Sequence, residues 1–160
     1  MTVKPGDSLP DVKISKAGPN GPEPLQTGSF FAGRKVVLFA VPGAFTPTCS
    51  ARHLPGFVDQ AEALRAKGVD EIACLSVNDA FVMGAWGKQH TADGKVTMLA
   101  DGNGEFTKAL GLDFDGSGFG MGLRSQRYAL IAENGKVTAL FVEQPGKFEV
   151  SAADYVLGQL

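Results

Sequence analysis

An uninterrupted apolar run at residues 36–41 (VVLFAV) constrains the fold of this chain more than any other segment. Its length suits a strand, and because no polar residue breaks it, both faces of that strand must be buried, as in the middle of a largely parallel sheet. Residues 72–77 (IACLSV) repeat the pattern, and a segment with helical spacing follows each run. The order strand, helix, strand, helix predicts an α/β fold.

Periodicity and boundary residues predict the next elements. In chain order they are a helix at residues 49–67, kinked at Pro55 and ended by Gly68; a helix capped by Asn78-Asp79 that carries Phe81, Val82 and Trp86; a strand at 96–100; and a short helix at 106–110 ended by Gly111.

The pair Asn134-Gly135 stands between two apolar runs, residues 128–132 and 137–142, and is the strongest short-range signal for a β-hairpin. A final helix is predicted over residues 151–160, with Ser151 as its N-cap and Asp154 at the third helical position. The chain has 160 residues and no repeat or linker, so we expect one domain over residues 1–160. These elements fit a thioredoxin-like fold, a central mixed β-sheet flanked by helices, although periodicity alone supports only α/β.

Composition excludes several classes of partner. Fifteen Lys and Arg against seventeen Asp and Glu leave a net charge of −2, so no basic surface is available for nucleic acid. No apolar run approaches the ~18 residues that a membrane span needs, so we expect no membrane association. Residues 1–7 contain no apolar signal segment, and two cysteines are too few for a disulfide scaffold. We therefore expect a reducing, cytoplasmic location.

Cys49 is the leading candidate for chemistry. The loop at residues 42–48 leaves the carboxyl end of a central strand, where open α/β sheets place their ligand sites, and Cys49 opens the helix that follows. Unpaired N–H groups and the helix dipole favour a thiolate there, and Thr46 can add a hydroxyl donor. A thiolate is a nucleophile, so a catalytic cysteine is one interpretation; a buried structural thiol is the other.

Other candidates are less specific. Cys74 lies inside an apolar strand, where an inert core thiol is the ordinary outcome. It could act as a resolving thiol only if its Cα comes within ~7 Å of the Cα of Cys49. Arg124 and Arg127 precede the hairpin, and either can reach the strand end beside Cys49. His53 lies one helical turn after Cys49. It can tune the thiolate, hold the residues that contact Cys49, or lie on the surface. His90 suits a cation at a helix C-terminus.

Motifs that are absent narrow the choice. Without Cys-x-x-Cys the chain is not an ordinary dithiol oxidoreductase, and the two Cys and two His lack the spacing of a zinc site. Residues 28–35 do not form a P-loop, and the glycines at 116–122 miss the dinucleotide fingerprint, so a mobile loop is the simpler interpretation of them.

The spacing Pro42-x-x-x-Thr46-x-x-Cys49 resembles the active-site motif of the peroxiredoxins, which are thiol peroxidases. The longer run at residues 41–50 (VPGAFTPTCS) is similar to the peroxiredoxin 5 (type II) subfamily. Residues 53–57 (HLPGF), 74–82 (CLSVNDAFV) and 86–87 (WG) also match that subfamily. The similarity extends over essentially the whole chain.

The resemblance implies a role for each matching residue. Cys49 corresponds to the peroxidatic cysteine, Thr46 to the hydroxyl that bonds the peroxide and Pro42 to the residue that shields the pocket. Arg127 corresponds to the active-site arginine, with Arg124 as the weaker candidate. The implied reaction reduces hydrogen peroxide and small alkyl hydroperoxides through a Cys49 sulfenic acid, with no metal or organic cofactor, in a homodimer.

One departure concerns recycling of the enzyme. Animal members of the subfamily carry a resolving cysteine in the C-terminal region, and residues 146–151 contain none. Bacterial and plant-like members share this two-cysteine layout and use glutaredoxin and glutathione, so an external thiol, from these or from thioredoxin, is expected; Cys74 is the secondary candidate. A non-catalytic binding module, or a cysteine hydrolase with His53 or His90 as base, are the competing functions.

Overall fold

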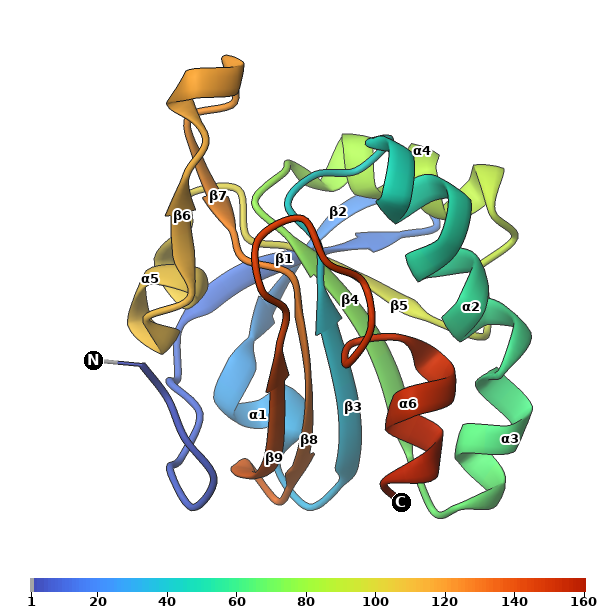
Figure 1. Ribbon diagram of the computed structural model, residues 1–160. Coiled ribbons are helices and arrows are strands. Elements are labelled where there is room, and N and C mark those ends of the chain that lie inside the picture. The colour runs from blue at the N-terminus through green and yellow to red at the C-terminus, as the bar shows by residue number, and fades with distance from the viewer. Residues whose placement is uncertain (1) are drawn as a thin grey trace.

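Residues 2–160, which the computed structural model describes, contain a seven-stranded mixed sheet. The predicted fold class, a thioredoxin-like α/β sheet flanked by helices, is confirmed (Figure 1). In spatial order the strands are β2 (Gly21–Gln26), β1 (Lys13–Gly18), β5 (Thr97–Ala100), β4 (Glu71–Ser76), β3 (Lys35–Ala40), β8 (Tyr128–Glu133) and β9 (Lys136–Val142).

Helices pack on both faces of the sheet (Figure 1). One face is covered by α2 (Leu54–Asp59), α3 (Ala61–Ala66), α4 (Ala80–Gln89) and α6 (Ala153–Gly158), and the other by α1 (Thr27–Phe31) and α5 (Glu105–Leu110). A separate ribbon, β6 (Asp113–Asp115) and β7 (Leu123–Ser125), projects beyond the sheet and carries the single turn η2 (Ser117–Phe119) at its tip. Within residues 2–160, no helix has the length and apolar character needed to cross a membrane.

The unbroken apolar run forms most of the central strand β3. It pairs in parallel with β4 and antiparallel with β8. Val37 and Phe39 pack into the core under α2 and α4, whereas Val36, Leu38 and Ala40 pack into the opposite core. Both faces are buried, as the unbroken apolar pattern requires.

Local signals at element boundaries behave as predicted in three places. Asn134 and Gly135 both have positive φ, 50° and 78°, the backbone that a tight two-residue hairpin turn demands. Gly111 ends α5 in the left-handed conformation, which costs a glycine little. The Asp79 carboxylate caps α4 by accepting a hydrogen bond from the Val82 N–H at 2.8 Å.

The helix predicted over residues 49–67 is instead divided into three. It starts as a π-helical turn, η1 (Cys49–His53), in which the Leu54 N–H donates to the Cys49 carbonyl five residues back. Pro55 has no N–H, and its ring clashes with a carbonyl four residues earlier, so a regular α-turn cannot run through it. A second break, at Gln60 (φ −97°, ψ 7°), separates α2 from α3.

Two further differences have local causes. The β1–β2 hairpin was not predicted, because Pro22 and Pro24 interrupt the strand pattern; they are tolerated since β2 is an edge strand. The last helix begins at Ala153 rather than Ser151, and Ser151 is not its cap. The Ser151 hydroxyl donates instead to the Glu143 carboxylate, at 2.7 Å.

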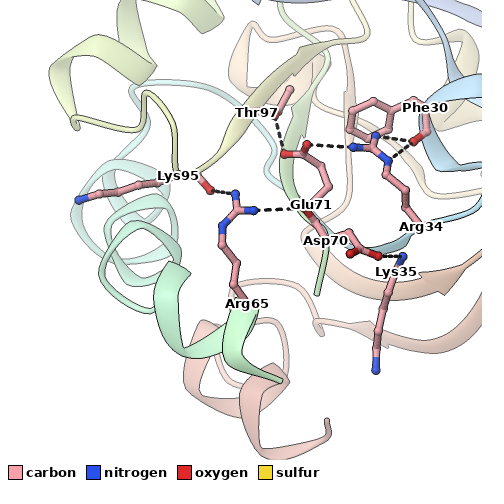
Figure 2. A network of polar contacts seen from close by, with 8 residues as sticks. All are labelled: Phe30, Arg34, Lys35, Arg65, Asp70, Glu71, Lys95 and Thr97. Carbon is pink, nitrogen blue, oxygen red and sulfur yellow. Dashed lines mark hydrogen bonds and ion pairs between the residues drawn. The ribbon is translucent and has the colours of Figure 1, made fainter. Parts of the chain in front are cut away.

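Polar contacts hold together the amino ends of the parallel strands (Figure 2). Glu71, which starts β4, accepts from Arg34 at 3.1 Å and from Thr97, which starts β5, at 2.7 Å. Asp70 accepts the Lys35 N–H at the start of β3, at 2.9 Å. This network fixes the amino end of the sheet and leaves the loops at its carboxyl end to build the site.

Candidate active site

The loop that carries Cys49 is fastened to the neighbouring strand end. The Asn78 side-chain oxygen, just beyond β4, accepts from the Ala44 N–H at 3.0 Å and from the Ser76 hydroxyl at 2.6 Å. Phe45, within the loop, adopts φ 65°, a conformation that favours glycine. After the loop, the Trp86 indole N–H of α4 donates to the Ser50 hydroxyl at 2.9 Å, which fixes the residue next to Cys49.

Two donors converge on the Cys49 sulfur, whose residue is fully buried. The Thr46 hydroxyl lies 2.8 Å from Sγ and Arg127 Nη2 lies 3.0 Å from it. The Thr46 oxygen is also 2.7 Å from the Gly43 carbonyl, and its single proton can serve only one acceptor. When that proton points to sulfur, two donors face Sγ, one of them cationic.

Arg127 is itself held by His53. Arg127 Nη1 lies 2.7 Å from His53 Nδ1, and since a guanidinium can only donate, Nδ1 accepts. The ring proton is therefore on Nε2, which donates to the Ser151 carbonyl at 3.0 Å. Burial, together with the Arg127 charge, lowers the pKa of His53 to about 3, so the imidazole is neutral at ordinary pH.

This geometry decides among the interpretations of His53. The surface placement is wrong, because the side chain is fully buried. His53 contacts Arg127 rather than the sulfur, and its accepting nitrogen is occupied. It therefore has no lone pair with which to deprotonate Cys49, which argues against the hydrolase alternative.

The lowered pKa predicts that His53 makes the fold sensitive to acid. The unfolded chain binds a proton at His53 near pH 6.5 and the native chain does not, so the free energy of unfolding should fall as the pH falls below about 6.5, by about 1.4 kcal/mol per pH unit for this one group. Urea unfolding between pH 7.5 and 5.5 measures the slope. His53→Gln should lose this contribution, and equal slopes in the two proteins would contradict it.

Arg124 and a cavity lie beside the loop that carries Cys49. Arg124, on β7, donates to the Pro42 carbonyl at 3.4 Å and to the Met121 carbonyl at 3.0 Å, so it holds the ribbon to the loop and does not touch Cys49. Pro42 and Arg127 line a cavity of about 590 Å³. The rest of its lining comes from Thr48, the β6–β7 ribbon with Phe114 and Phe119, and residues 125–126 and 143–148.

The second cysteine lies inside the sheet, in the same buried core cluster as Cys49. Cys74 lies in β4 opposite Phe39 of β3 and Met98 of β5, fully buried, and both cysteines are free thiols. Burial and, secondarily, the charge of Cys49 raise the pKa of the Cys74 thiol. His90 follows the last residue of α4, as predicted, and its Nε2 is buried with no hydrogen-bond partner among residues 2–160.

Sequence reasoning missed the loop that closes over this site. Phe148 packs with its ring centroid 5.0 Å from that of His53, and the Arg52 guanidinium carbon lies 4.7 Å from the Phe148 centroid. Glu143 and Ser151 complete the loop through the hydrogen bond noted above. A glutamate and a serine eight residues apart give no local pattern, so only the folded chain brings them together.

The thioredoxin-like sheet and a buried cysteine flanked by an arginine and a threonine define a class, the thiol-dependent peroxidases. Comparisons with known proteins specify the family. The redoxin family model matches residues 4–157. Arabidopsis thaliana Peroxiredoxin-2B is 52% identical over 158 residues, which is 97% of this chain and 96% of that protein. This chain belongs to the peroxiredoxins, in the type II subfamily, and is an oxidoreductase.

Solved structures agree with this assignment. The crystal structure of reduced Prx3 from Vibrio vulnificus in complex with H2O2 is 55% identical with a TM-score of 0.95, and the match covers 99% of each chain. Peroxiredoxin 5 from Alvinella pompejana is 35% identical with a TM-score of 0.84, over 97% of this chain and 96% of that one.

Proposed function

We propose that this peroxiredoxin reduces hydrogen peroxide and small alkyl hydroperoxides with Cys49 as the nucleophile. The observation that carries the proposal is the placement of the Cys49 sulfur between the Thr46 hydroxyl and the Arg127 guanidinium, at 2.8 and 3.0 Å. Both groups donate hydrogen bonds, and no other ionisable side chain is within hydrogen-bond distance of Sγ among residues 2–160.

The chemistry follows from these donors. The Cys49 thiolate attacks one peroxide oxygen, so that an S–O bond forms as the O–O bond breaks, and the leaving oxygen departs with the electron pair. Arg127 and Thr46 stabilise the negative charge as it moves from sulfur to that oxygen. The leaving group takes up a proton to become water or an alcohol, and Cys49 is left as a sulfenic acid.

The cavity supports a small substrate. Its volume of about 590 Å³ is within the ~300–1,000 Å³ range of small-molecule sites, and three phenylalanines are part of its lining. Pro42 lines the cavity from the loop that carries Cys49, and Phe114, Phe119 and Phe148 give the cavity an apolar surface that suits an alkyl group. The related Prx3 crystallised with H2O2 provides a precedent for the smallest substrate.

We further propose that an external thiol recycles the enzyme, either glutathione with glutaredoxin or thioredoxin. The thiol attacks the Cys49 sulfenic acid and releases water, and a second thiol reduces the mixed disulfide. Cys74 is poorly suited to this attack, because it is held in a strand paired on both sides and its raised pKa keeps it protonated.

Thiol counting after a single turnover tests the proposal. Reduced wild type and Cys74→Ala are each mixed with one equivalent of hydrogen peroxide in a stopped-flow instrument, followed by intact mass and thiol titration. Both should consume peroxide rapidly and retain a trappable sulfenic acid at Cys49. Loss of both thiols within one chain would make Cys74 the resolving residue, and reaction no faster than free cysteine would refute the peroxidase assignment for Cys49.

The protein is also proposed to be a homodimer. The proposal rests on the resemblance to the subfamily, and a partner would find three large apolar side chains exposed: Phe45, Phe81 at 72% and Phe119 at 79%. A sedimentation measurement that returned the monomer mass at micromolar concentration would remove this part of the proposal.

A further inference from the structure

The loop from Glu143 to Ser151 is closed by a single carboxylate oxygen. Glu143 Oε2 accepts from the Glu149 N–H at 2.6 Å, from the Ser151 N–H at 2.8 Å and from the Ser151 hydroxyl at 2.7 Å. Glu143 is only 8% exposed, and its own N–H donates to the Arg127 carbonyl at 3.0 Å. The two ends of the loop are therefore fastened together directly beside Arg127.

This closure positions the group that orients His53. The Ser151 carbonyl accepts the His53 Nε2 proton, and the same residue gives its N–H and its hydroxyl to Glu143. Because the N–H and the hydroxyl of Ser151 are both bonded to Glu143, the Cα of Ser151 is held in place, and this restricts the positions that its carbonyl can reach. Phe148, on the same loop, covers the His53 ring and excludes water from it.

A continuous path of hydrogen bonds then leads from Glu143 to the sulfur. Its successive links are Glu143 to Ser151, Ser151 to His53, His53 to Arg127, and Arg127 to Cys49. The Ser151 carbonyl accepts a proton from His53 Nε2 and so selects the tautomer that carries its proton there. In that tautomer, Nδ1 is free to accept from Arg127 Nη1. Arg127 can then direct Nη2 at the sulfur.

We propose that Glu143 is a positioning residue: by clamping the 143–151 loop it fixes the Ser151 carbonyl and, through His53, the Arg127 guanidinium on Cys49. This inference rests on the role proposed for Arg127. Glu143 does not touch the sulfur, and the pocket residues beside it belong to the loop that it closes. Although burial of Glu143 acts to raise its pKa, the hydrogen bonds from Ser151 and Glu149 lower it, so the carboxylate is ionised at neutral pH.

The test is the rate of Cys49 oxidation in Glu143→Gln. The amide keeps the size of the side chain but removes the charge, which weakens the three bonds that converge on Oε2. We expect the second-order rate constant for hydrogen peroxide to fall roughly 10- to 100-fold, the scale of a small misplacement of a catalytic group. Glu133→Gln, the same change at an exposed position at the end of β8, is the matched control and should leave the rate unchanged.

Two readouts separate positioning from a general loss of structure. In the Arg127→Lys background the effect of Glu143→Gln should disappear, because there is no guanidinium left to position; a penalty of the same size would overturn the inference. The ¹⁵N shifts of His53 should show its single Nε2-H tautomer in wild type and a mixture in Glu143→Gln. Unchanged shifts together with an unchanged rate would also overturn it.

The two proposals fail differently. If Arg127→Lys itself leaves the peroxide rate intact, the proposed function of Arg127 is wrong, whereas loss in Arg127→Lys without loss in Glu143→Gln refutes only the role of Glu143. Should Glu143→Gln not fold, Glu143→Asp applies the same test, because a side chain one methylene shorter withdraws the oxygen from its three donors while keeping the charge. The same loss is expected there, and a wild-type rate would refute the positioning role.

Discussion

Cys49→Ser is expected to abolish peroxide reduction, with a loss of at least about 10⁴-fold in the second-order rate constant, the scale seen when an enzyme loses its nucleophile. A serine hydroxyl preserves the contacts with Thr46 and Arg127 but is not ionised at neutral pH and attacks an O–O bond poorly. Consumption of hydrogen peroxide by the reduced protein, with a thiol reductant present in excess, measures the effect.

Cys74→Ala is the control for that experiment. It removes the other thiol of the chain from a buried strand position that has no contact with Arg127 or Thr46 among the hydrogen bonds of residues 2–160. Its peroxide rate should stay near that of the wild type even if the fold is less stable. If Cys49→Ser kept its activity, or if only Cys74→Ala lost it, Cys49 would not be the nucleophile.

Arg127→Lys should show the second largest effect, a loss of about 10²–10³-fold in the same rate constant, comparable with removal of an oxyanion donor. Arginine serves His53 with Nη1 and Cys49 with Nη2 at once. A lysine ammonium is a single point charge on a flexible stem and cannot span both acceptors. The charge is conserved in this variant, so the measured loss reports the two-point geometry rather than the electrostatic attraction alone.

Arg124→Lys gives the matched comparison for this prediction. Arg124 bonds the carbonyls of Pro42 and Met121 and does not reach the sulfur. Its replacement should cost less than about tenfold, through a looser ribbon. Equal losses at Arg124 and Arg127 would show that the rate depends on guanidinium groups near the pocket in general, and not on the contact between Arg127 and Cys49.

Much of the sheet could be predicted because its cause is local. The strand at residues 36–41 follows from an unbroken apolar run, and the Asn134-Gly135 turn follows from two residues that adopt positive φ. The approach of Thr46 to Cys49 is equally local, since a spacing of three residues at a helix start brings the two side chains together. In each case a few neighbouring residues determine the geometry.

The contacts made by Arg127 and Ser151 have a different origin. Arg127 reaches Cys49 because β8 pairs antiparallel with β3, with Tyr128 opposite Ala40, which sets Arg127 beside the loop that leaves β3. The hairpin signal predicts that β8 pairs with β9. It does not predict that β8 also pairs with β3, because that depends on where the hairpin lies in the sheet. Ser151 resembles a helix cap in sequence, but a carboxylate eight residues away competes for its hydroxyl and prevails in the folded chain.

The hydrogen bond from Trp86 to Ser50 gives the protein an intrinsic optical reporter. Trp86 is the single tryptophan of the chain, so all indole emission arises at one place, and its N–H is bonded to the residue that follows Cys49. A rearrangement of η1 that moves Ser50 changes the polarity around that indole. If the proposed oxidation and reduction of Cys49 each displace Ser50, the fluorescence of the unlabelled protein will report them as separate phases.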